Sequence, residues 1–226
     1  MVPSDSGALL EPLLAQDLRL PAVWNWVQTS MTFDAAHDTA HLERVARWTL
    51  RCAPTLAPGL AIAAALTHDV VNLPKNHPQR AQASTLAADA VRARLPSLGF
   101  DAAEAEAVAA AVRDHSYSRG ATPETLLGAA LQDADRLDAL GALGILRAAA
   151  AGGSMGRALL HATDPFCTAR TPDDAAYTVD HFFTKLLRLE TTFQTPTGRQ
   201  EAARRTGVMR VFLANLGEEV GVEFSG

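Results

Sequence analysis

The chain contains few of the residue types that mark several common protein classes. Of its 226 residues only two are cysteines, Cys52 and Cys167, and neither lies in a CxxC or similar spacing. A disulfide framework and a cysteine-based zinc site are therefore not expected. Aromatic residues make up 6% of the chain, and Val, Ile and Thr do not gather into alternating runs, which argues against strands. Apolar runs fall short of the ~18 residues that a membrane helix needs. We expect a cytoplasmic protein without a membrane partner.

Lysine is also scarce. The chain has 20 basic and 25 acidic residues, with a net charge of −5, so stable binding to nucleic acid is not expected. A small anionic substrate remains compatible with this balance. Only Lys75 and Lys185 are lysines. Their presence in this chain suggests that a compact ammonium charge has a function at these two positions. Chance retention in an arginine-rich chain is the alternative.

Helical periodicity runs nearly from end to end. The 48% hydrophobic content suits one domain with a sizeable core. Asp34 and Asp101 are expected to cap helices, and Pro78 is expected at a first helical position. Loops are expected at 71–78, 117–122 and 152–172. The sequence therefore predicts an all-α, single-domain helical bundle with helices at 36–52, 59–70, 78–95, 101–116, 123–139, 140–151, 173–189 and 197–216.

Histidines and carboxylates gather in a few segments. His37 and His41 are four residues apart, on one helical face, although a partly buried histidine face explains that pair as well. The His68-Asp69 doublet ends a helix of Ala, Ile and Leu, where a cation would offset the cost of burying a carboxylate. The alternative is a surface helix end. Mixed nitrogen and oxygen ligands suit Mn²⁺, Fe²⁺, Mg²⁺ or Zn²⁺.

A third acidic segment, Gln132-Asp133-Ala134-Asp135-Arg136-Leu137-Asp138, lies in a predicted amphipathic helix. Asp135 and Asp138 are about one turn apart, beside the apolar face. A solvated charged edge with Arg136 as counter-ion is the alternative interpretation.

Together these segments resemble the HD-domain metal-dependent phosphohydrolase superfamily, whose pattern is one His, a His-Asp doublet and a later Asp. The resemblance extends to a small stand-alone bacterial branch called YedJ-like. It covers most of the chain, from about residue 34 to residue 190, and rests on the following stretches: His37-Asp38 through His41 to Arg44-Val45, His68-Asp69, Leu73 to Arg80, Gln132 to Gly141, Asp164-Pro165-Phe166, and Asp180-His181-Phe182 with Thr184 to Leu187.

The resemblance implies metal ligands at His41, His68, Asp69 and Asp135. Asp133 competes with Asp135 for the last position, but the spacing of Asp135 to Asp138 matches the superfamily better. His115 falls where some relatives place a histidine that binds a second metal or a phosphate oxygen. Its other role would be a helix-terminal histidine. The sites inferred in this way are catalytic Asp69 and His115, phosphate-binding Lys75, Arg80 and Lys185, and the secondary positions His37, Asn76, His77, Asp133, Asp138 and His181.

The implied activity is metal-dependent hydrolysis of a phosphate ester or anhydride. The metal would be Mn²⁺ or Mg²⁺ first, with Fe²⁺, Co²⁺ or Zn²⁺ as alternatives. A nucleotide is the expected substrate, and pyrophosphohydrolysis of a nucleoside triphosphate is the first hypothesis. Val70, Val71 and Asn72 follow the doublet where some relatives have an acid, so the general base stays open. We expect a metal-site core at about 34–140 of one domain, 1–226, with C-terminal helices at 173–216 covering the site.

Two rivals come from other classes. An HD-like di-iron oxygenase would need more ligands than these four, and a non-catalytic nucleotide sensor would have been free to lose His68 or Asp69. The apolar stretch 208–216 could be core or the surface of a homodimer, with core as the simpler expectation.

Overall fold

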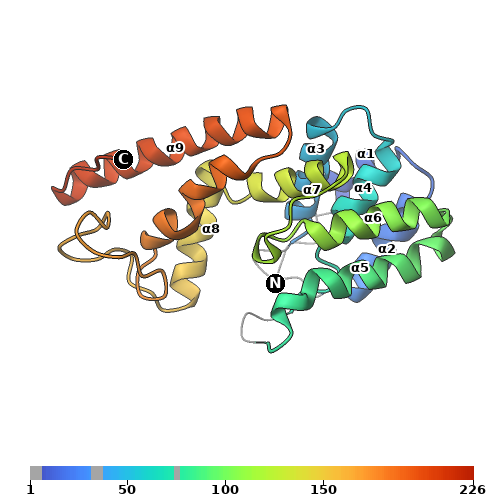
Figure 1. Cartoon of the computed structure of the whole chain (residues 1–226), viewed down its shortest axis with the longest axis horizontal. Coiled ribbons are helices and arrows are strands. Elements are labelled where there is room, and N and C mark those ends of the chain that lie inside the picture. The colour runs from blue at the N-terminus through green and yellow to red at the C-terminus, as the bar shows by residue number, and fades with distance from the viewer. Residues whose placement is uncertain (1–6, 32–37, 74–76) are drawn as a thin grey trace. The chain divides into compact units, whose positions relative to one another are not determined.

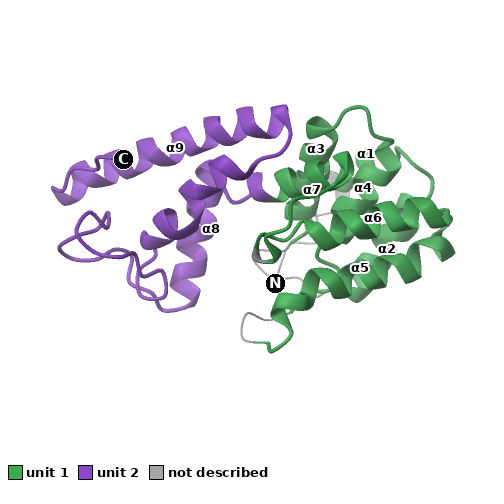
Figure 2. Cartoon of the chain, in the orientation of Figure 1, with its two compact units in different colours: residues 1–135 green, residues 136–226 purple. Residues whose placement is uncertain are grey.

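The computed structural model describes residues 7–31, 38–73 and 77–226 (Figure 1). Within these ranges the chain is all-α, as the sequence predicts, and its β pairing consists of an isolated parallel bridge between Ala158 and Tyr177. The chain divides into two compact units (Figure 2). Unit 1 comprises residues 1–135 and unit 2 comprises residues 136–226. The prediction that C-terminal helices cover the site stays a prediction.

Unit 1 is built around a short apolar helix. Its α-helices are α1 (Gly7–Leu14), α2 (Leu20–Ser30), α3 (Thr39–Cys52), α4 (Pro58–Thr67), α5 (Ala83–Arg94), α6 (Ala102–Asp114) and most of α7 (Leu126–Leu137). Helix α4 packs against α2, α3 and α6, and α5 packs against α6. All of the α4 residues from Ala61 to Thr67 are buried. Because most of them are alanines, neighbouring backbones can approach α4 closely. The helix therefore places His68, the residue that directly follows it, in the interior of unit 1, with Asp69 next in the chain.

Helix α3 begins at Thr39, later than the expected start at 36. Asp34 lies outside the described residues, so its capping role is not described. The capping residue of α3 is Asp38, whose Oδ1 accepts a hydrogen bond from the backbone N–H of His41 at 2.7 Å. This cap satisfies a free amide of the first turn. It also fixes the start of the helix and thus the backbone position of His41.

The cap predicted at Asp101 is confirmed and forms a reciprocal pair. Asp101 Oδ1 accepts from the N–H of Glu104 at 2.8 Å, and Glu104 Oε2 accepts from the N–H of Asp101 at 2.9 Å. Replacing Asp101 with Ala is expected to lower the free energy of unfolding by about 1 kcal/mol, measured by urea denaturation. Asp89→Ala, at an exposed position inside α5, is the control and should cost less. An unchanged urea midpoint in Asp101→Ala would contradict this role of the cap.

Two helices of the N-terminal segment were not predicted. Pro12 lies inside α1, and Pro21 lies in the first turn of α2, where its missing N–H is not needed. In α2 the apolar side chains of Leu20, Val23 and Val27 are fully buried, so tertiary packing holds this helix in place.

Helix α5 also starts later than expected. Pro78 lies in a turn, residues 80–82 form a single 3₁₀ turn, and α5 begins at Ala83. The start expected at Pro78 is therefore wrong. The backbone N–H groups of Arg80 and Gln82 donate to the carbonyls of His77 and Gln79, which are bonds between residues three apart and keep this segment 3₁₀.

Unit 2 contains α8 (Gly141–Ser154) and α9 (Pro196–Val220), which pack against each other. Helix α8 continues through Gly152 and Gly153, which the sequence suggested as a break. Gly152 is buried, and a Cβ there would lie 2.1 Å from Thr178 Oγ1. The glycine is thus required for close packing of α8 against the segment around Thr178.

The helix expected at 173–189 is the main error in the fold prediction. Residues 173–179 contain no α-helix, Asp180 and His181 are helical and lead into a π-helical turn at 182–186, and 187–192 are 3₁₀. Thr178 N–H donates to Ala158 O at 2.8 Å, and Val179 N–H donates to Leu159 O at 3.0 Å. The backbone groups that a helix would have used are therefore paired with the segment after α8.

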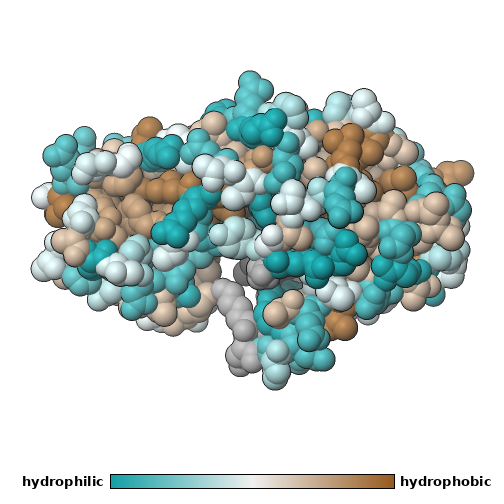
Figure 3. Space-filling model, in the orientation of Figure 1, coloured by the Kyte–Doolittle hydropathy of each residue, from teal (hydrophilic) through white to brown (hydrophobic). Residues whose placement is uncertain are grey.

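The surface carries scattered apolar side chains. Leu146, Leu159 and Val211 are each more than 60% exposed, and the face in Figure 3 shows polar and apolar groups mixed over both units. Scattered exposure of this kind is ordinary. In the described part of the chain, no helix has the length and hydropathy needed to cross a membrane. Cys52 and Cys167, both in described segments, are not joined in a disulfide.

Candidate metal centre

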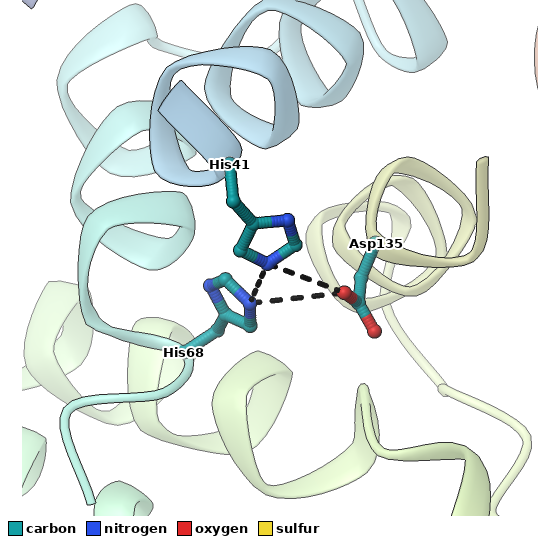
Figure 4. A group of neighbouring side chains, drawn as sticks. All are labelled: His41, His68 and Asp135. Atoms are coloured by element: carbon teal, nitrogen blue, oxygen red, sulfur yellow. Dashed lines mark hydrogen bonds and ion pairs between the residues drawn. The ribbon is translucent and has the colours of Figure 1, made fainter. Parts of the chain in front are cut away.

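Three elements of unit 1 bring two histidines and a carboxylate together. His41 comes from α3, His68 follows α4 and Asp135 comes from α7, and the three side chains point toward one another (Figure 4). His41 Nε2 lies 3.2 Å from His68 Nε2 and 3.6 Å from Asp135 Oδ1. His68 Nε2 lies 3.8 Å from the same Asp135 oxygen. Three potential ligand atoms thus face one small volume.

Asp69 connects this group to a third histidine. Its Oδ2 lies 3.2 Å from His68 Nε2, and its Oδ1 lies 3.8 Å from His115 Nε2. His68, Asp69 and His115 form a second group of potential ligands. The two carboxylate oxygens of Asp69 therefore approach different histidines, and His68 belongs to both groups.

His68 and His115 are held in the same way. Each is the residue that ends a helix, α4 or α6, and each Nδ1 contacts the carbonyl oxygen three residues earlier. The distances are 2.8 Å from His68 Nδ1 to Ala65 O and 2.6 Å from His115 Nδ1 to Val112 O. Since a carbonyl only accepts, Nδ1 carries the proton in both rings, which leaves Nε2 with a lone pair when the ring is neutral. A backbone partner on the second ring nitrogen is typical of metal-binding histidines.

The distances and the donor set fit a divalent cation. Two imidazole Nε2 atoms 3.2 Å apart repel each other unless a proton or a cation lies between them. Ligands at ~2.0–2.2 Å from a common ion are separated by roughly 3–4 Å, which includes the distances from His68 Nε2 to His41, Asp69 and Asp135. Because His68 Nε2 has one lone pair, it can serve one cation, so the two groups do not form two complete centres.

The two classes of ligand differ in burial. The side chains of His41 and His68 are 1% and 0% exposed, whereas those of Asp69 and Asp135 are 23% and 29% exposed. The histidines thus form the closed floor of the cluster. The carboxylates form its more exposed side, where a ligand from solvent could enter.

The electrostatics of the cluster are those of an acid–imidazole network. Burial disfavours the charged form of His68 and is the largest single influence, but Asp69 and then Asp135 outweigh it and raise the pKa of His68 to about 9. Burial also opposes ionisation of Asp69, yet His68 and His115 hold the pKa of that carboxyl well below its ordinary value. The pKa of Asp135 is lowered too, against burial, by His68, His115 and His41. The cluster therefore holds two carboxylates that a metal can use directly.

Other residues expected near the site are not all in this cluster. Lys75, His37 and Asn76 lie outside the described residues. Asp133 is fully buried but belongs to neither ligand group. Asp138 is 2% exposed and pairs with Arg147 within unit 2, so the charged edge suggested by the sequence is not solvated at this residue.

The remaining predicted positions have local roles that the structure shows. Arg80 Nη1 donates to Asn72 Oδ1 at 3.0 Å and to Leu73 O, so Arg80 holds the loop that follows Asp69. His77 Nδ1 accepts from the N–H of Gln79 at 3.1 Å. His181 and Lys185 belong to unit 2, where His181 Nδ1 contacts Asp174 Oδ2 at 2.7 Å.

The sequence analysis missed the residues that support His115. Asp114 pairs with Arg113 and Arg119, and Gln132 bonds to the backbone on both sides of the His115 segment. A signal for Gln132 was available, because it lies three residues before Asp135 and thus on the same side of α7.

Comparison with known proteins places this cluster in a family. The model of the HD domain matches residues 39–140, the stretch that contains His41, His68, Asp69, His115 and Asp135. YpgQ of Bacillus subtilis is 32% identical over 202 residues, which cover 86% of this chain and 90% of YpgQ. The chain belongs to the HD-domain superfamily. The resemblance seen in the sequence is thereby confirmed at the level of the superfamily, while the YedJ-like branch stays a prediction.

Solved structures agree with this assignment. The crystal structure of YpgQ matches with a TM-score of 0.70 and 27% identity, covering 91% of this chain and 97% of YpgQ. A second YpgQ structure, in complex with ADP, matches with a TM-score of 0.66 and 29% identity over 88% and 96% of the two chains. An HD-superfamily hydrolase of Bacillus thuringiensis matches with a TM-score of 0.69 and 27% identity over 92% and 100%. The all-α fold of the HD type is therefore confirmed.

Proposed function

We propose that the chain is a metal-dependent phosphohydrolase that acts on a nucleotide. The observation that carries the proposal is the convergence of His41, His68 and Asp135 within ligand distance of one another, with Asp69 Oδ2 3.2 Å from His68 Nε2. Two further findings support it. The Bacillus thuringiensis relative is described as a hydrolase, and YpgQ has been crystallised with ADP. Hydrolysis of a nucleoside triphosphate to pyrophosphate and a monophosphate is the first form of the reaction to test.

The four ligands favour Mn²⁺ among the candidate ions. Mg²⁺ prefers an all-oxygen set, whereas imidazole suits later transition metals and carboxylate suits Mg²⁺ and Mn²⁺. A bound divalent cation supplies Lewis acidity, which makes water a better nucleophile and offsets charge on the attacked phosphate. Fe²⁺, Co²⁺ and Zn²⁺ fit the same ligands and belong in the test.

Asp69 and His115 are proposed to handle the proton. Asp69 is ionised at neutral pH because the neighbouring imidazoles lower its pKa, so it can accept a hydrogen bond from an attacking water. His115 keeps Nε2 toward Asp69 because its Nδ1 is fixed by Val112 O. The imidazole can then accept the proton, or donate one to a phosphate oxygen when charged. The structure provides geometry for both assignments of the general base.

Arg80, Lys75 and Lys185 are proposed to bind phosphate oxygens. With Nη1 of Arg80 bonded to Asn72 and Leu73, its guanidinium plane is fixed, and a phosphate would use the Nη2 and Nε groups. The two lysines would act as point charges. His37, Asn76, His77, Asp133, Asp138 and His181 stay predicted secondary positions.

The test is a metal-reconstitution assay. Protein stripped of metal would be incubated with nucleotides and simple phosphate esters, in the presence of Mn²⁺, Mg²⁺, Co²⁺, Zn²⁺ or no metal, and phosphate and pyrophosphate would be measured separately. We expect Mn²⁺-dependent release of pyrophosphate from nucleoside triphosphates and its loss in Asp69→Ala. His161→Ala, in unit 2 against Tyr177, is the matched control. Metal binding without turnover on the whole panel would overturn the hydrolase and favour a sensor, whereas oxygen-dependent turnover with iron would favour an oxygenase.

A further inference from the structure

Gln132 is a fully buried amide in unit 1 that the proposed reaction does not use. It lies on α7, and its side chain is 0% exposed. Its Nε2 donates to two backbone carbonyls, Asp114 O and Ala121 O, each at 2.9 Å. Both amide protons of the side chain are thereby used.

The two carbonyls lie at the two ends of the segment that carries His115. Asp114 is the last residue of α6, so its carbonyl is among those that the helix leaves without a partner. Ala121 follows the 3₁₀ turn Tyr117–Arg119 and Gly120, which has a positive φ of 65°. One amide therefore closes a short loop from the inside, directly after helix α6 ends. Arg119 closes it from the outside, through Asp114 Oδ1 and Thr85 Oγ1, with a side chain 37% exposed.

Helix α7 connects this clamp to the cluster. Gln132 and Asp135 are three residues apart and lie on the same side of α7. One helix thus supplies a candidate metal ligand and, one turn earlier, the amide that fixes the backbone next to His115. Gln132 Oε1 is buried without a hydrogen-bond partner. Burying this oxygen without a partner costs free energy, so the side chain is expected to have a role besides packing.

We propose that Gln132 is a positioning residue that acts through His115 and, by way of His115, on Asp69. The clamp holds the end of α6 so that His115 Nε2 stays next to Asp69 Oδ1. Asp69 can then keep Oδ2 next to His68 Nε2, the atom that the group of His41, His68 and Asp135 shares with it. This inference rests on the proposed metal centre, but it concerns the affinity of the protein for metal and does not depend on the substrate.

The experiment is a double-mutant cycle read by Mn²⁺ affinity. The wild type, Gln132→Met, His115→Ala and the double variant would be titrated with Mn²⁺ after removal of metal. Methionine keeps the length of the side chain and loses both hydrogen bonds. We expect each single variant to bind Mn²⁺ about 10- to 100-fold more weakly, the range for residues that orient metal ligands. The double variant should bind no more weakly than His115→Ala, because the clamp has nothing left to position.

Two further variants separate positioning from loss of stability. Leu131→Ala removes a fully buried neighbour on α7 without touching the clamp, and it should keep the wild-type affinity for Mn²⁺ although its thermal midpoint falls. Gln132→Asn keeps the amide but is too short to reach both carbonyls, and it replaces Gln132→Met if that variant does not fold. Wild-type affinity in the Gln132 variants, or additive losses in the double variant, would overturn the proposal. A wild type that binds no metal would instead refute the proposed metal centre.

Discussion

Replacing His68 with Ala is expected to weaken metal binding strongly and to remove metal-dependent hydrolysis with it. His68 Nε2 is the atom common to both ligand groups, and it lies within 3.8 Å of His41, Asp69 and Asp135. Loss of a direct ligand should exceed the effect of an orienting residue, so we expect Mn²⁺ affinity to fall on the order of 10³-fold. Calorimetric titration of metal-free protein measures it. His161→Ala should bind Mn²⁺ as the wild type does.

The protonation of His68 is expected to make metal binding depend on pH. Asp69 and Asp135 raise the pKa of His68 to about 9 against the effect of burial, whereas ligation needs the neutral ring. Below pH 9 a metal must displace this proton, so the apparent affinity of the wild type should rise about tenfold per pH unit. It should level off above pH 9. A flat profile between pH 7 and 8 would show that His68 is not the titrating ligand.

Whereas metal affinity is expected to rise with pH, the stability of the metal-free protein is expected to fall with pH. Because the pKa of His68 is higher in the folded protein than the ordinary value of about 6.5, its imidazolium stabilises the metal-free fold fully below that pH. This contribution is lost as the pH rises through about 9. Metal-free protein should therefore become less stable over this interval, while protein with bound metal should not follow the same trend. Thermal unfolding with and without Mn²⁺ compares the two.

The sequence was sufficient for the parts of the site that depend on local order. The run of small apolar residues in α4 predicts a buried helix, and the structure shows that His68, directly after it, is fully buried while Asp69 is 23% exposed. Likewise, the apolar face of Leu127, Leu131 and Ala134 fixes which side of α7 packs inward, and all three side chains are buried. These predictions rest on periodicity, which survives folding because it decides which face is buried.

What the sequence could not supply depends on contacts between distant segments. The end of α6 is clamped by Gln132, 18 residues away from the Asp114 carbonyl it binds, and no local pattern announces that bond. The non-helical backbone at 173–179 similarly depends on pairing with residues 158 and 159. A helical periodicity in the sequence cannot exclude such a partner, because tertiary hydrogen bonds outweigh local preference.

The second large effect is expected on the stability of unit 2, from substitution of Asp180. This residue directly follows the segment that pairs with residues 158 and 159. This carboxylate is fully buried and accepts three hydrogen bonds, from Arg170 Nη1 at 2.5 Å, Arg170 Nη2 at 2.6 Å and the N–H of Asp173 at 2.6 Å. Burial opposes its ionisation, but Arg170 and the Asp173 amide more than compensate, so the pKa of Asp180 is lowered. Asp180→Asn leaves the guanidinium of Arg170, 19% exposed, without its counter-ion.

We expect Asp180→Asn to lower the free energy of unfolding of unit 2 by about 3–5 kcal/mol, the cost of breaking a buried pair from one side. All three tryptophans, Trp24, Trp26 and Trp48, lie in unit 1, so tryptophan fluorescence would not report on unit 2. Urea unfolding should therefore be followed by far-UV circular dichroism. Glu190→Gln, which breaks the more exposed pair with Arg210, is the control and should cost under about 1 kcal/mol. A loss no larger than this control would contradict the prediction.

A second variant decides whether the pair stabilises the fold or only avoids a penalty. In Arg170→Met/Asp180→Asn both charges are removed, so no buried charge is left without a partner. The double variant should therefore be more stable than Asp180→Asn. The pH dependence gives an independent check. Because the pKa of Asp180 is depressed in the folded protein, its contribution is complete above the ordinary value of about 3.9 and is lost as the pH falls through the folded value. Asp180→Asn should therefore be less sensitive to acid than the wild type, and equal sensitivity would place the acid-labile group elsewhere.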